Sequence, residues 1–357
     1  MAKKLSDLFF SSVRRAARAQ RRVLKQMTTP VRKARKSAAR KTSTKTASAQ
    51  TTSAKTSAAK GSWQNFVHNT APSRSELLGR LAYSLYRPKD HPLPGLPLVI
   101  MLHGCQQTAT DFAAGTRMNA LADKKGFVVA YPQQAKRVQA MRCWRWFQPD
   151  AGHGLAEADA IADLAGTLVR RFGLDAGRVY IAGLSAGAGM AALAILRHPD
   201  IFAAAALHSG AVVGAARNAA AGLQVMRKAS DEEPVKLIAP LLNPLQPFLA
   251  RPVMIIHGQR DHVVAPRNAG QLAEQFSGLT GGRTQKRSVL AQGTHREYVR
   301  EDFLKGKQTV VRLCLLKEVG HAWGGGDERF KFHTKKGPNA SVLIWQFFAM
   351  QARSKRP

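Results

Sequence analysis

The sequence predicts an α/β protein with a mostly parallel sheet, flanked on both faces by helices and preceded by a disordered basic leader. From about residue 78, short apolar runs alternate with longer helical stretches, the pattern of strand–helix–strand units joined by right-handed crossovers. Hydrophobic residues make up 45% of the 357 residues, enough to build a packed core. We expect residues 62–357 to form one folded domain behind a leader of residues 1–61.

The leader carries a dense positive charge. The whole chain has 55 Lys and Arg against 22 Asp and Glu, and residues 1–61 hold 17 of the basic residues but a single acid, Asp7. Between Leu5 and Met27, apolar residues recur at helical spacing among arginines, which is typical of an amphipathic helix on an anionic or apolar surface. After Pro30 the chain is rich in Lys, Ala, Ser and Thr as far as Lys60, and we expect a flexible linker there.

Three roles for this leader stay open: a solubilising tail, an anchor to a granule or other surface, and a weak contact with nucleic acid. A secretory signal is not expected because Arg14 and Arg15 interrupt the apolar stretch, whereas a transit peptide fits the composition. No apolar run reaches 18 residues, so we expect no transmembrane helix. Three cysteines exclude a disulfide-rich scaffold.

The elements of the body follow from its apolar runs and helical periodicities. Most predicted strands are short and continuously apolar, as expected of strands buried on both faces. Residues 309–316, in contrast, show period-two character. Strands are predicted at residues 98–102, 127–131, 178–182, 202–207, 253–257 and 309–316, and helices at 110–125, 155–172, 186–197, 267–276 and 340–350.

The strand at residues 178–182 runs directly into Gly183-Leu-Ser-Ala-Gly187, followed by a helix. A serine on such a sharp strand-to-helix turn presents its hydroxyl above the sheet, and the flanking glycines admit the closely passing backbone. We therefore predict Ser185 as a catalytic nucleophile.

A serine hydroxyl needs a base to take its proton. In this strand–turn–helix context the expected chain order is serine, acid, histidine. Asp261 follows the strand at 253–257 and His321 follows the strand at 309–316, so both lie at the carboxyl edge of the sheet. We predict that His321 is the general base and that Asp261 orients it. Asp327 is a fallback acid.

Two neighbouring histidines receive other roles: His262 is expected in a pocket wall or on the surface, and His257 as a packing residue. The oxyanion of a tetrahedral intermediate needs backbone N–H donors. We predict the amides of Ala186, after the nucleophile, and of Cys105, in the loop after residues 98–102, with Gln106 as the alternative to Cys105.

These segments resemble the esterase family that includes poly(3-hydroxybutyrate) depolymerases, within the α/β-hydrolase fold. The resemblance spans about residues 80–350 in order. It is carried by LHGCQQT at 102–108, MNALAD at 118–123, CWRWF at 143–147, RVYIAGLSAG at 178–187, HSG at 208–210, HGQRD at 257–261 and GHAWGGG at 320–326.

The resemblance implies hydrolysis of carboxylic esters, with a polyester or its oligomers as the leading substrate class. It implies Ser185, Asp261 and His321 as the triad and places the oxyanion-loop cysteine at Cys105. It also implies pairing of Cys105 with Cys143 in an oxidising compartment, and free thiols in a reducing cytosol. Trp144, Trp146 and Trp323 become candidates for the wall of a substrate cleft.

Alternatives remain open. The basic leader resembles an adaptation of intracellular members acting on storage granules, which implies a cytoplasmic, granule-associated protein; an extracellular protein is the alternative. A general short-chain, feruloyl or acetyl-xylan esterase would share these motifs, and a non-enzymatic granule- or DNA-binding protein is the third hypothesis. No cofactor or metal is expected, because the sequence has no Walker, dinucleotide or HExxH motif.

Overall fold

The computed structural model describes residues 59–70, 79–150, 153–242 and 249–353. All of these belong to one unit, Ala54–Pro357. The helix and linker predicted for the leader lie almost wholly outside the described residues. Within the part of the chain that the structure describes, no helix is both long and apolar enough to cross a membrane.

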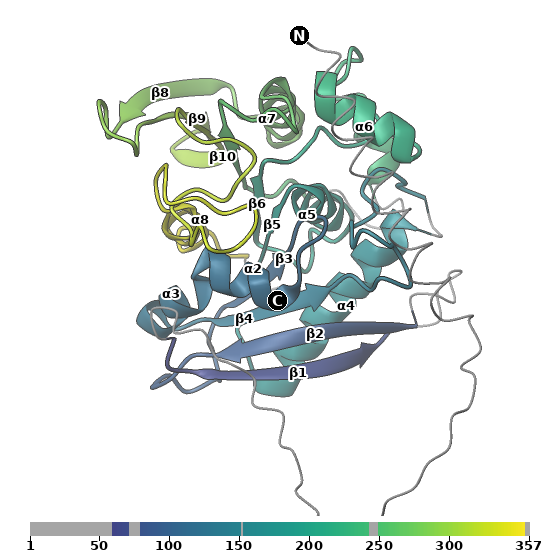
Figure 1. Ribbon diagram of the computed structural model, residues 1–357, viewed down its shortest axis with the longest axis vertical. Helices are drawn as coiled ribbons and strands as arrows, with labels where there is room; N and C mark the ends of the chain where they lie inside the picture. Colours follow the sequence, from purple (N-terminus) through teal and green to yellow (C-terminus); the bar gives the residue numbers. More distant parts are fainter. Residues whose placement is uncertain (1–58, 71–78, 151–152, 243–248, 354–357) are drawn as a thin grey trace, which may run out of the picture. The chain divides into compact units, whose positions relative to one another are not determined.

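The described strands form one ten-stranded sheet, in the order β1-β2-β4-β3-β5-β6-β7-β10-β9-β8 (Figure 1). The central strands from β4 to β10 run parallel, whereas the pairs at both ends of the sheet are antiparallel. This confirms the predicted mostly parallel sheet. The strands are β1 Ser62–Asn69, β2 Arg80–Arg87, β3 Leu98–Leu102, β4 Val128–Gln133, β5 Val179–Leu184, β6 Ala204–His208, β7 Val253–Gly258, β8 Thr284–Leu290, β9 Tyr298–Lys305 and β10 Gln308–Leu316.

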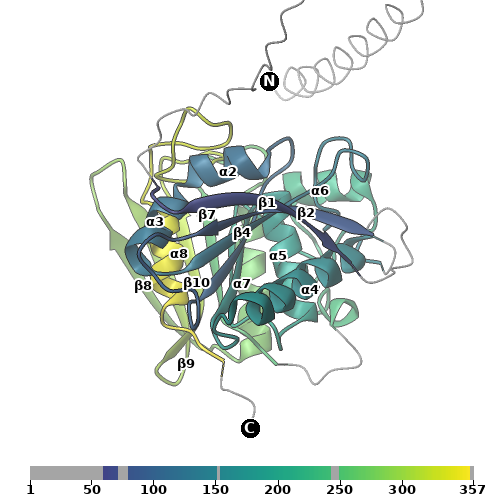
Figure 2. The same ribbon diagram turned by 90° about the horizontal axis from the view of Figure 1, so that it is seen from below.

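Helices cover the sheet on both faces. Figure 2 shows α3 and α8 on one side of the sheet and α4, α5 and α7 on the other. The helices are α2 Ala109–Thr116, α3 Met118–Lys125, α4 Gly154–Phe172, α5 Ala186–Arg197, α6 Ala219–Lys228, α7 Arg267–Thr280 and α8 Ala340–Phe348, with a short 3-10 helix at Ala239–Leu241.

Strand β3 shows why both layers form. All five of its side chains are buried. Leu98, Ile100 and Leu102 join the apolar cluster of α4, α5 and α7, while Val99 and Met101 join the cluster of α2, α3 and α8. Alternate side chains of a strand point to opposite faces, so a continuous apolar run requires cover on each side.

Two predicted boundaries are wrong. The helix predicted at 110–125 is interrupted at Arg117, whose φ of 55° lies in the left-handed region and ends α2 before α3 begins. The strand predicted to end at residue 131 continues as β4 through Pro132 to Gln133. Its parallel pairing with β3 has already ended at Ala130, so the missing proline N–H removes no bond on that side.

The prediction also missed β1, β2, β8, β9 and α6. Strand β1 alternates between exposed and half-buried residues and contains Gln and Asn, so it lacks the apolar run that identified the central strands. In β8 the sequence TQKRSVL is mostly polar, and the strand exists because it pairs with β9.

Candidate active site

The turn between β5 and α5 holds Ser185 in a strained backbone conformation, with φ 56° and ψ −117°. A Cβ on Gly183 would come within 2.2 Å of the carbonyl oxygen of Gly187, and a Cβ on Gly187 within 2.2 Å of the carbonyl oxygen of Leu102. No side chain fits at either place, so both glycines are required for the turn to pack against β3.

The structure brings Ser185, Asp261 and His321 together from the carboxyl ends of β5, β7 and β10. His321 Nε2 lies 3.0 Å from Ser185 Oγ, and His321 Nδ1 lies 2.7 Å from Asp261 Oδ2. With the proton on Nδ1, the imidazole donates to the carboxylate and accepts from the serine hydroxyl. This arrangement can take the proton of Ser185 while Asp261 holds the ring and stabilises its charged form.

Asp261 is buried and supported by its own loop. Its Oδ1 accepts the amide N–H groups of Val263 and Val264 at 2.9 and 2.8 Å. Burial alone would raise the pKa of Asp261, but the hydrogen bond from His321, with further charge and amide interactions, lowers it on balance. The carboxylate is therefore ionised when it faces His321.

Two buried histidines, His257 and His208, lie next to the triad. Neither was predicted from the sequence to support it. His257 Nε2 donates to the carbonyl oxygen of Val264 at 2.9 Å and thus braces the Asp261 loop. His208 Nε2 accepts the amide of Gly324 at 3.3 Å and so fixes the loop after His321. Burial lowers the pKa of both rings, that of His208 to about 3, so they act as neutral supports.

The loop after β3 lies against the nucleophile, since a Cβ on Gly104 would be 3.5 Å from Ser185 Cβ. Ala186 is the first residue of α5, where a helix leaves its N–H groups without an internal partner. The amide of Gln106 is already bonded to the carbonyl oxygen of Met141 at 2.7 Å. Among the described residues no such bond occupies the Cys105 amide, which favours Cys105 over Gln106 as the second donor.

His103 fixes the orientation of that donor. Its Nδ1 donates to the carbonyl oxygen of Gly104 at 2.8 Å, and this carbonyl shares a peptide plane with the N–H of Cys105. On the other side, His103 Nε2 accepts the amide of Gln134 at 3.1 Å, which settles the tautomer. Burial lowers the pKa of His103 to about 4, so the ring is neutral at ordinary pH. No motif in the sequence predicted this role for His103.

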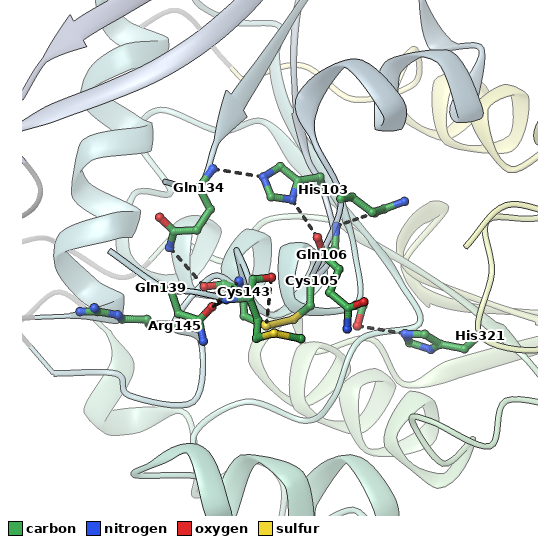
Figure 3. Close-up of a disulfide and its surroundings, with 12 residues drawn as sticks. His103, Cys105, Gln106, Gln134, Gln139, Cys143, Arg145 and His321 are labelled. Carbon is green, nitrogen blue, oxygen red and sulfur yellow. Dashed lines mark hydrogen bonds between the residues drawn. A yellow bond between two sulfur atoms is a disulfide. The ribbon is translucent and has the colours of Figure 1, made fainter. Parts of the chain in front are cut away.

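A disulfide joins Cys105 to Cys143, 38 residues later. The Oε1 of Gln139 accepts the amides of both Met141 and Cys143, which holds the far side of the bridge. Figure 3 shows His321 on the opposite side of the disulfide from Gln134 and Arg145. The cross-link that the resemblance implied is thus present, and it ties the loop after β3, where an oxyanion donor is predicted, to the segment at Cys143.

Glu157 of α4 supports the segment behind the disulfide. Its two carboxylate oxygens accept from Gln134 Nε2 at 2.7 Å and from the amide of Arg145 at 2.8 Å. Burial raises the pKa of Glu157 to about 7 despite these bonds. In the sequence, Glu157 is one polar residue of an amphipathic helix, and nothing there predicts that it is buried or that it supports this segment.

The three tryptophans predicted as a substrate wall are corrected by the structure. Trp144, Trp146 and Trp323 are at most 4% exposed, so their rings are buried in the core rather than presented to a substrate. Trp146 packs against Gly189 of α5, and Trp323 stacks on His208 with ring centres 5.0 Å apart. Their large apolar surfaces favour the core, and they support the site from beneath.

The remaining residues predicted near the site, Asp327 and His262, form no hydrogen bond with Ser185, His321 or Asp261 among the described residues. Asp327, the fallback acid, pairs with Arg117 and Arg329. His262 is exposed. Within the described residues, no group of three or more His, Cys, Asp or Glu side chains is arranged to hold a metal ion.

Comparison with known proteins identifies the family. Residues 81–300, more than half of the chain, match the family described as esterase PHB depolymerase. The chain belongs to this family. Among curated proteins, the chain is similar to poly(3-hydroxyalkanoate) depolymerase C of Paucimonas lemoignei, with 34% identity over 188 residues, covering 52% of the chain and 45% of that relative.

Other relatives are named for other ester substrates. Feruloyl esterase B of Neurospora crassa is 28% identical over 193 residues, covering 52% of the chain and 65% of that protein. The chain thus spans about half the length of the curated relatives it matches. The solved acetyl xylan esterase of Aspergillus awamori superposes with a TM-score of 0.66 at 18% identity, over 81% of the chain and 99% of that structure, which shows the shared α/β-hydrolase fold.

Proposed function

We propose that the chain is a serine carboxylic ester hydrolase whose substrates are poly(3-hydroxybutyrate) and related polyesters or their oligomers. The observation that carries the proposal is the hydrogen-bonded series Ser185–His321–Asp261, with distances of 3.0 and 2.7 Å. The match to depolymerases supports the substrate class.

The proposed reaction follows from this geometry. Ser185 Oγ attacks the ester carbonyl carbon as His321 Nε2 takes its proton. The amides of Cys105 and Ala186 stabilise the oxyanion, and His321 returns the proton to the leaving alcohol oxygen. Water, activated by the same histidine, then hydrolyses the acyl-enzyme to release the carboxylic acid. No step requires a cofactor or a metal.

The test compares wild type with Ser185→Ala on amorphous poly(3-hydroxybutyrate) granules and on a soluble p-nitrophenyl butyrate. We expect monomer or oligomer release by the wild type only, with the variant slower by about 10⁴-fold or more. Hydrolysis of the soluble ester alone would favour a general esterase, and assays on feruloylated and acetylated xylan would then decide between the classes of its relatives. Inactivity of the wild type on all substrates would contradict the proposal.

The Cys105–Cys143 disulfide favours the extracellular alternative for localisation, since such bonds persist in oxidising compartments. Thiol titration of the denatured protein, isolated without reductant under alkylating conditions, is the check. One free thiol, that of Cys314, is expected in the oxidised form, whereas a cytosolic, reduced protein would show three.

We also propose that the basic leader binds an anionic or apolar granule surface. A granule-binding assay at rising salt is the test, with the full chain and a variant lacking residues 1–58. Binding retained at high salt would indicate the apolar helix, and binding lost with salt would indicate electrostatic attraction. Equal binding by both proteins would contradict this role.

A further inference from the structure

Lys331 places a positive charge beside the oxyanion loop. Its Nζ donates to the Oε1 of Gln106 at 2.6 Å, and Gln106 directly follows Cys105. Both the Lys331 and Gln106 side chains are exposed, so the charge is open to a ligand. An ammonium has three N–H donors, of which one is used here and two remain available.

The position of this ammonium relative to the triad is fixed by two contacts. Lys331 Nζ lies 4.8 Å from the centre of the Phe332 ring, and that ring meets the His321 ring edge-on with centres 6.0 Å apart. A single aromatic ring therefore separates the ammonium from the catalytic histidine. The buried side chain of Gln107 also donates to the carbonyl oxygen of Lys331 at 2.9 Å and accepts the amide of Gly104 at 2.8 Å.

Lys331 differs from Arg329 and Lys335 of its segment in lacking an acidic partner. Arg329 pairs with Asp327 at 2.7 Å, and Lys335 pairs with Glu328 at 3.0 Å. Within the described residues, no carboxylate forms an ion pair with Lys331. An exposed cation without an acidic partner, close to the reacting groups, attracts an anionic group of the substrate.

We propose that Lys331, with Gln106, binds the terminal carboxylate of a hydroxy-acid ester oligomer and so directs cleavage to ester bonds near a chain end. The inference rests on the proposed ester hydrolysis. Each cleavage of such a polyester releases one carboxylate and one hydroxyl group, whereas internal segments of the polymer hold only neutral esters. The ammonium thus distinguishes an oligomer or chain end from the interior of the chain.

The experiment compares two substrates of equal size: the dimer of 3-hydroxybutyrate as its free acid and as its terminal carboxamide. Wild type should show the higher kcat/KM on the acid, mainly through KM. Lys331→Gln should reduce the ratio of kcat/KM on the acid to kcat/KM on the amide by roughly 5- to 10-fold. This is the effect expected for the loss of one charge-assisted hydrogen bond. The wild-type preference should also shrink as salt screens the charge.

Lys335→Gln is the matched control, because it removes the same charge from the same segment but from a side chain paired with Glu328. It should leave the acid-to-amide ratio unchanged. Equal kcat/KM values for both dimers in the wild type, or an unchanged ratio in Lys331→Gln, would overturn the carboxylate site while leaving ester hydrolysis intact. If the wild type hydrolyses neither dimer nor p-nitrophenyl butyrate, the proposed ester hydrolysis itself is overturned.

Discussion

The turn that carries Ser185 and the loop that carries Cys105 meet at one site but are held in different ways. Five consecutive residues make the turn, and the helix behind it begins at once, with the amide of Ala188 bonded to the carbonyl oxygen of Ser185. The loop is held by residues far along the chain. Gln134 bonds to His103 over 31 positions, Cys143 to Cys105 over 38, and Lys331 to Gln107 over 224. A short motif thus suffices to predict the nucleophile, whereas the predicted oxyanion donor is positioned by contacts that form only in the folded protein.

Gly187→Ala tests the point where the two regions touch. Its Cβ would collide with backbone oxygens of Leu102 and His103, at 2.2 and 2.7 Å, so the turn and the loop must separate. We expect kcat/KM to fall by more than about 1,000-fold, because nucleophile and oxyanion donors both move. Gly270→Ala in α7 is the control: its Cβ meets nothing within 4 Å, and it should stabilise the protein by about 0.5–1 kcal/mol. Equal activity in the two variants would refute the close contact.

His103→Leu disturbs the loop alone. It removes the donor to the Gly104 carbonyl that orients the Cys105 amide, and we expect a roughly 100-fold lower kcat with little change in KM. His103→Asn should recover part of this loss, because its side-chain amide can donate like Nδ1. Steady-state kinetics with thermal melts separate this effect from unfolding. A fall in kcat that the unfolded fraction in the melts accounts for, with no rescue by asparagine, would contradict a positioning role.

Cys143→Ser removes the covalent link of the same loop. Closure of a 38-residue separation predicts a loss of about 2–4 kcal/mol in the free energy of unfolding. Activity should fall less, by about 10-fold, because the bond from the Gln106 amide to the Met141 carbonyl remains. Cys314→Ala, at the buried free cysteine of β10, is the control and should lose stability without a specific loss of kcat. Full wild-type activity of Cys143→Ser would show that the loop needs no cross-link.

The contrast between the regions also explains what could be predicted from the sequence. Ser185, Asp261 and His321 each follow a central strand whose apolar run is visible, and the sheet's geometry brings their positions to one edge. The roles of His103, His208 and Glu157 depend on side chains that meet only after folding, so no local pattern reveals them. The tryptophans were misplaced for a related reason: their types suit a cleft or a core equally well, and only the packing against Gly189 and His208 decides.

A further expected effect changes stability with pH and concerns the support behind the loop. Between the ordinary pKa of 4.5 and its folded value of about 7, Glu157 keeps a proton in the folded state that the unfolded chain releases. Its contribution to stability is therefore fully present below pH 4.5 and is lost as pH rises towards 7, by about 3 kcal/mol in total.

Glu157→Gln should abolish this contribution, so the difference in unfolding free energy between variant and wild type should grow in the variant's favour from pH 4.5 to 7. Denaturant unfolding at several pH values measures it, with the exposed Glu274→Gln as the control. A pH-independent difference between Glu157→Gln and wild type would show that the carboxylate does not titrate in this window.

The central claim is that Ser185, activated by His321, is the nucleophile of an esterase. The most direct test treats the protein with diethyl p-nitrophenyl phosphate and locates the adduct by peptide mass spectrometry. We expect one diethylphosphoryl group on Ser185, formed with parallel loss of ester hydrolysis and formed far more slowly in His321→Ala. Labelling at another residue, or loss of activity without a label on Ser185, would contradict it.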